Sequence, residues 1–119
     1  MKLYEILSNN TGASFDLTVG TETRTLILER FSVDTLVKYE NDGLDITTIF
    51  DNINKQQSTW ITKLAFDLMS QPSKDEFNND LEIFRKCIDT GSLKTVSEAV
   101  FKTIENSQPK NVQTESLPQ

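Results

Sequence analysis

The sequence contains no histidine, the residue on which many catalytic and metal sites depend. It holds one cysteine, Cys87, so no disulfide can form within the chain, and we expect a reducing compartment. Lysine and arginine are also scarce, with 12 against 18 aspartates and glutamates and a net charge of −6. Because nucleic-acid affinity depends largely on basic contacts with phosphates, this balance argues against a nucleic-acid partner.

Long apolar runs are absent as well. A membrane-spanning helix needs about 20 consecutive apolar residues, and the runs here are far shorter. The first ten residues, MKLYEILSNN, carry one lysine and a short apolar run interrupted by Glu5, with no small-residue cleavage site, so they do not form a secretory signal. We therefore expect a soluble intracellular protein with no membrane partner.

The side chains that remain as candidates for catalysis or metal binding are the carboxylates and the single thiol. The acidic side chains are densest in one short stretch: Asp75, Glu76, Asp80 and Glu82. This spacing does not match the ligand positions of a calcium-binding loop, so we interpret these residues as solvated helix charges. The basic neighbours of Cys87 point in other directions on a helix, which favours a structural thiol. The sequence predicts no catalytic residue, no metal ligand and no cofactor.

An alternating pattern marks the first folded segment. Apolar residues alternate with polar ones from Phe15 to Val19 and again towards Leu28, and the two runs are separated by a connection at Gly20. This pattern predicts a β-hairpin over residues 15–28. A hairpin leaves strand edges open, so we expect the edge of its second strand, roughly residues 23–28, to contact a partner or a second copy by strand addition. Leu26 and Leu28 are the candidate protein-binding residues of this strand.

From Ser32 onward the apolar residues recur every three or four positions, which predicts helices. Ser32 and Ser58 are predicted N-caps, and Ser73 begins a capping-box pattern for a helix that runs to Ile88. A last helix is expected from Ser92 or Thr95. The prediction is an α+β fold, mainly an α-helical bundle with an N-terminal β-hairpin. Residues 1–107 form one domain, with helices over 32–106, and residues 108–119 form a flexible tail.

Trp60, the only tryptophan, lies in the helix that we predict to be the centre of the core. Its apolar stripe favours core packing, but tryptophan is also enriched at binding hot spots, so Trp60 is a candidate protein-binding residue too. A helix-turn-helix motif is an alternative interpretation of the last two predicted helices. Its second helix would be neutral, because two lysines are balanced by two glutamates.

The order of these segments resembles the small tail assembly chaperones of long-tailed bacteriophages. The likeness covers about residues 15–109 and rests on the hairpin, the stretch RFSVDTLVKYENDG and the helices that end at VFKTIENSQP. It implies a non-enzymatic protein of the host cytoplasm that binds the tape measure protein, keeps it soluble and is absent from the mature virion. The tail tube protein is a second candidate partner. The likeness also implies a longer form made by a ribosomal frameshift, for which Lys110 and Asn111 offer a possible slippery site.

An alternative from another class is a small regulator that binds protein or DNA through its last two helices. A third is a small enzyme that uses its acidic residues. A basic surface stripe would favour the regulator, and two carboxylates that converge in a pocket would favour the enzyme.

Overall fold

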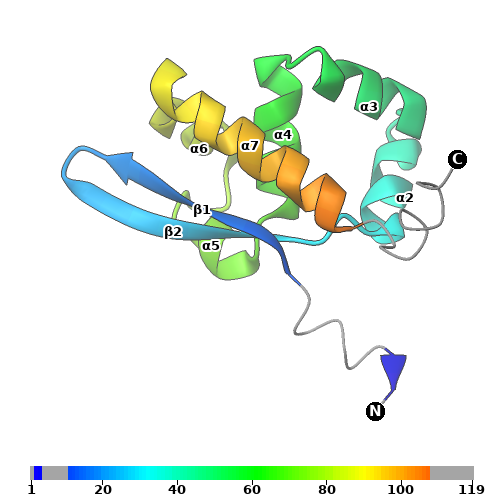
Figure 1. Cartoon of the computed structure of the whole chain (residues 1–119), viewed down its shortest axis with the longest axis horizontal. Helices are drawn as coiled ribbons and strands as arrows, with labels where there is room; N and C mark the ends of the chain where they lie inside the picture. The colour runs from blue at the N-terminus through cyan, green and yellow to red at the C-terminus, as the bar shows by residue number, and fades with distance from the viewer. Residues whose placement is uncertain (1, 4–10, 108–119) are drawn as a thin grey trace, which may run out of the picture.

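The computed structural model describes residues 2–3 and 11–107. A two-stranded antiparallel sheet, β1 (Thr11–Val19) and β2 (Glu22–Glu29), precedes a layer of helices (Figure 1). The helices are α2 (Val33–Asn41), α3 (Ile46–Asn54), α4 (Ser58–Leu68), α5 (Gln71–Asp75), α6 (Leu81–Cys87) and α7 (Thr90–Asn106). This arrangement confirms the predicted α+β fold with helices dominant. The predicted tail, residues 108–119, lies outside the described residues, as does most of the segment before Thr11.

The hairpin turns tightly and buries one face. Val19 pairs with Glu22, and Gly20 has a φ of 64°, a left-handed conformation that glycine adopts without a steric penalty. The buried face consists of four side chains that are at most 6% exposed: Phe15, Leu17, Leu26 and Leu28. The hairpin is confirmed, and it begins at Thr11, four residues before the predicted start.

The outer edge of β2 is closed over part of its length. The Ile27 N–H donates to Ser73 Oγ at 2.9 Å, and the Ser70 N–H donates to the Ile27 carbonyl at 2.9 Å. Leu28 also forms a β-bridge with Met69. The prediction that this edge is open up to Leu28 is therefore wrong, because Met69 and Ser70 of the α4–α5 connection and Ser73 of α5 occupy its last residues.

Helix α4 is the centre of the core, as predicted. Six of its side chains are buried: Ile61, Thr62, Leu64, Ala65, Phe66 and Leu68. The helix contacts α3, α6, α7 and β2. Helix α7 in turn packs against both α4 and β1, so the hairpin and the helices share one core (Figure 1).

The predicted helix from Ser73 to Ile88 is instead two short helices. Asn78 and Asn79 both have positive φ values, 54° and 57°, which interrupt the helical path after α5. Asp80 then caps α6 by accepting from the Glu82 N–H. Ser73 does not cap a helix. It is buried inside α5, and its hydroxyl accepts the hydrogen bond from the Ile27 N–H at the edge of β2.

Other helix starts also differ from the predictions. Ser32 precedes α2 as predicted, but its side chain makes no capping hydrogen bond. Helix α4 begins at Ser58 itself, with Gln57 in the cap position. Helix α7 begins two residues before the earliest predicted start, because Asp89 and Ser92 form a reciprocal capping box.

Candidate protein-binding surface

The two leucines that the sequence suggested for partner binding are core residues. Leu26 and Leu28 are both 0% exposed, and they face the helices across the hairpin. Their side chains cannot reach a partner in the folded chain. This part of the prediction does not fit the structure, because the alternation of β2 directs these two side chains inward.

Trp60 lies at the margin of the core. Its ring packs edge-on against Tyr39, with 6.0 Å between centroids and an interplanar angle of 83°, and it is half-buried. Tyr39 is itself only 3% exposed, so Trp60 covers the contact between α2 and α4. Both interpretations stay open for Trp60, because one part of its ring packs on the core and the other part reaches the surface.

The phenylalanine side chains fall into a buried group and a half-buried group. The chain has seven phenylalanines, and four of them are at most 7% exposed: Phe15, Phe66, Phe77 and Phe84. The other three are half-buried, and they come from the connection after β2, from α3 and from α7: Phe31, Phe50 and Phe101. We call these three residues the aromatic cluster.

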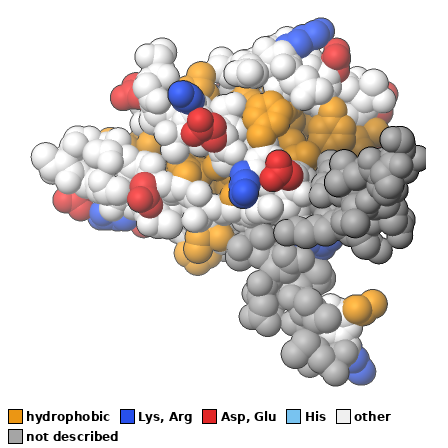
Figure 2. Space-filling view, viewed as in Figure 1, with side chains coloured by type: hydrophobic (Ala, Val, Ile, Leu, Met, Phe, Trp, Pro, Cys, Tyr) orange, Lys and Arg blue, Asp and Glu red, His pale blue; other side chains and the backbone are white. Residues whose placement is uncertain are grey.

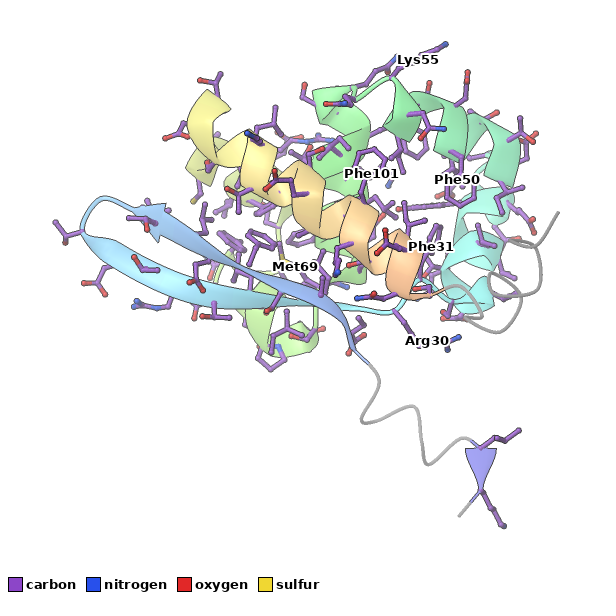
Figure 3. The ribbon with its side chains drawn as sticks, in the orientation of Figure 1. Arg30, Phe31, Phe50, Lys55, Met69 and Phe101 are labelled. Atoms are coloured by element: carbon purple, nitrogen blue, oxygen red, sulfur yellow. The ribbon has the colours of Figure 1, made fainter. Side chains whose placement is uncertain are left out.

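The aromatic cluster lies on one face of the molecule. Phe31 and Phe50 meet edge to face, with ring centroids 6.0 Å apart. Figure 3 places Phe50 and Phe101 on either side of the space between α3 and α7, and Figure 2 shows apolar side chains at the surface there. Three segments distant in sequence thus present aromatic rings on the same side.

A groove extends this face along α7. It has a volume of about 460 Å³ and runs between α7 and the corner where α3 meets α4. Three apolar residues line it, together with three uncharged polar residues and one residue of each charge: Ile61, Leu93, Phe101, Gln56, Thr90, Ser97, Lys94 and Glu98. Two ion pairs balance charge near this face: Lys55, at the C-cap of α3, lies 3.2 Å from Asp51, and Lys102 of α7 lies 3.9 Å from Glu105. The face therefore offers apolar side chains interspersed with polar and charged ones of both signs.

A pocket rich in charged side chains lies where α2, α4 and α5 meet. Its volume is about 250 Å³, and Lys38, Lys63 and Lys74 line it together with Asp42 and Asp67. The Tyr39 hydroxyl, also in the lining, donates to Asp67 Oδ2 at 2.6 Å, and Lys63 Nζ lies 3.4 Å from the same oxygen. The charges of this lining nearly cancel. The hydrogen bond from Tyr39 of α2 to Asp67 of α4 joins the two helices here.

Cys87 lines a third pocket, of about 300 Å³, beneath the hairpin. Apolar residues form much of the lining, among them Leu17 and Phe77. The neighbouring Arg85 directs its guanidinium away, towards α4, where Nε donates to Thr62 Oγ1 at 3.0 Å and Nη2 to the Thr59 carbonyl at 3.0 Å. Arg85 thus secures α6 to α4 and does not activate the thiol.

The regulator alternative gains no supporting feature in the described residues. Helices α6 and α7 are separated by only Ile88 and Asp89, and the exposed side of α7 carries Lys102 beside Glu105 rather than a basic stripe.

For the enzyme alternative, Asp42 and Asp67 line one pocket, and Glu22 and Glu76 line another. However, Tyr39 and Lys63 bond to Asp67, and Arg24 forms ion pairs with both glutamates. Across residues 2–3 and 11–107, no group of three or more Asp, Glu or Cys side chains could hold a metal ion. Within the same residues no helix is long and apolar enough to cross a membrane.

Comparison of the chain with protein-family models, curated protein sequences and solved structures finds no match.

Proposed function

We propose that this chain is a non-enzymatic chaperone of phage tail assembly, and that its aromatic cluster and the adjoining groove hold apolar helical segments of the tape measure protein. The observation that carries the proposal is the gathering of the three half-buried phenylalanines on one face, while the other four are buried. Aromatic rings on a scaffold of helices supply large apolar contact area with few rotamers to immobilise.

The shape of this face suits a helix. An amphipathic helix binds by placing side chains at i, i+3, i+4 and i+7 into an apolar groove. The space between α3 and α7 is bounded by helices, and its apolar residues extend from Leu93 to Phe50. The charged side chains of both signs on this face tolerate a partner with a mixed polar face. The net charge of −6 would keep a complex soluble while apolar surface is covered.

The resemblance extends the proposal to location and partners. The chain would act in the host cytoplasm, contact the tape measure protein, with the tail tube protein as a second candidate partner, and leave before the virion matures. It would also self-associate. Exposed apolar residues on α2 and α3, such as Val33 at 71% and Ile46 at 42% exposure, offer surface for contacts between copies.

The experiment is coexpression with a tape measure protein encoded beside this chain, followed by measurement of the soluble fraction. The variant Phe50→Ser/Phe101→Ser should leave the tape measure protein in the pellet, whereas wild type keeps it soluble. Val19→Ser is the matched control, because Val19 is apolar and 47% exposed but lies on the hairpin. Circular dichroism establishes that the double variant is folded. Equal solubility with the double variant, or no effect of wild type, refutes the proposal.

A further inference from the structure

The hydrogen bonds of β2 reveal which backbone groups face outward. The N–H and C=O of Ile27 bond to Ser73 and Ser70, so both groups point away from β1. In an antiparallel pair, successive residues direct these groups to alternate sides, so Leu26 faces β1. Its register partner Phe15 therefore faces β2. The residues on either side of Phe15 have their backbone groups on the opposite, outer edge of the sheet.

Three residues of β1 thus present an outer edge: Ser14, Asp16 and Thr18. Among residues 11–107, their N–H and C=O groups have no hydrogen-bond partner. At the base of the strand, α7 closes this edge, because Asn106 Nδ2 donates to the Gly12 carbonyl at 2.6 Å. Farther along β1 all three side chains are exposed, and the turn end of the hairpin extends past the helices (Figure 1).

We propose that the outer edge of β1 is a docking site for an extended segment of a partner protein, which adds as a third strand with a lysine or arginine opposite Asp16. Six unpaired backbone groups at strand spacing are a template for strand addition. The proposal concerns a second surface and does not depend on the aromatic cluster.

The side chains of the solvent face are already ordered for this contact. Thr25 Oγ1 donates to Asp16 Oδ1 at 2.7 Å, and Thr18 Oγ1 lies 2.7 Å from Thr23 Oγ1. These pairs run across to β2, so they leave the outer edge of β1 clear. A third strand would extend the existing sheet without rearrangement of the hairpin.

The negative charge of Asp16 indicates which kind of segment would bind to this edge. If β1 of a second copy paired with this edge through the same three residues, the two strands would run antiparallel with Asp16 at the centre. The two Asp16 side chains would then lie opposite each other. Like charges at that position destabilise a strand pair, whereas opposite charges stabilise it. In the described part of the chain, the Asp16 carboxylate forms no ion pair. The site therefore suits a basic extended segment of another protein rather than a second copy.

The probe is a capped synthetic peptide, TKVKVKT, added to the isotope-labelled chain, with amide chemical shifts as the readout. We expect saturable shifts at Ser14, Asp16 and Thr18. The peptide TEVEVET should bind about tenfold more weakly, as expected for reversal of a cross-strand charge pair. Absence of shifts with TKVKVKT, or equal binding of both peptides, would overturn the proposal.

Two proline variants locate the contact. Thr18→Pro removes an N–H that points outward from β1, and Thr23→Pro makes the same change at its register partner on the other edge. Both lose the same hydroxyl pair, so only the edge differs. Binding should disappear in Thr18→Pro and persist in Thr23→Pro, and persistence in both would refute the assignment. Asp16→Lys keeps the backbone and should reverse the preference between the peptides, which decides the question even if a proline variant unfolds.

Discussion

Replacement of Tyr39 by phenylalanine tests how α2 is fixed on α4. The hydroxyl of Tyr39 donates to Asp67 Oδ2 at 2.6 Å, and the residue is only 3% exposed. A hydrogen bond to a charged acceptor contributes about 1.5–3 kcal/mol to stability. The variant keeps the ring and its contact with Trp60, and Asp67 keeps Lys63 at 3.4 Å. We therefore expect the free energy of unfolding at pH 7 to fall by about 1.5–3 kcal/mol.

The same residue predicts a pH dependence. Burial and the hydrogen bond to Asp67 raise the pKa of the Tyr39 hydroxyl well above its ordinary value of 10.0. The folded state thus keeps a proton that the unfolded chain releases, so this contribution is complete below pH 10 and is lost as the pH rises above it. The loss amounts to about 1.4 kcal/mol per pH unit in wild type and is absent from Tyr39→Phe.

Urea unfolding followed by the fluorescence of Trp60, the only tryptophan, measures both effects. Other titrating groups are common to the two proteins and cancel in the difference. The stability gap between wild type and Tyr39→Phe should therefore shrink between pH 9 and pH 11. A gap that stays constant over this range, or no gap at pH 7, would refute the assigned role of the hydroxyl.

Three further outcomes are expected. Asp89→Ala should lower the melting temperature at pH 7, because the Asp89 carboxylate accepts from the Ser92 N–H at 2.7 Å and its pKa is lowered by that bond. This deficit should vanish in scans at decreasing pH, since the contribution is present above the ordinary carboxyl pKa of 3.8 and lost below it. Gly12→Ala should destabilise by about 1–3 kcal/mol in urea unfolding, because an added methyl group would collide with Thr103. Light scattering should report self-association at high concentration, and Val33→Lys should reduce it.

The parts of the fold that follow from periodicity could be predicted from the sequence. Alternation predicted the hairpin, and three-to-four spacing predicted α4 as the core helix, because burial of one face imposes those periods directly. The positions at which helices begin could be predicted less well from the sequence. Ser73 has the right spacing for a capping box, yet its hydroxyl accepts from the Ile27 N–H, 46 positions away in sequence. The local pattern carries no record of such a distant contact.

The candidate surfaces lay beyond sequence reasoning for a related reason. Leu26 and Leu28 were predicted to bind a partner because they are apolar residues on an apparent edge strand, but the inward face of a hairpin depends on what packs above it. The three phenylalanines of the aromatic cluster show no local signal that separates them from the four in the core. Only the packing of the connection after β2 against α3, and of α7 against α4, leaves them half-buried on one side.

Half-burial has an energetic consequence that suits a chaperone. Complete burial of a phenylalanine side chain contributes about 1.5–3 kcal/mol, but each ring of the aromatic cluster has already gained part of that in the free chain. Under the proposed function, each ring would therefore add only a fraction of this energy when a partner helix covers it, and would expose little apolar area when the helix leaves. Affinity would then come from several modest contacts rather than from one deep anchor. A protein that must hold a long apolar helix and release it during polymerisation requires this combination, because tight binding would block assembly.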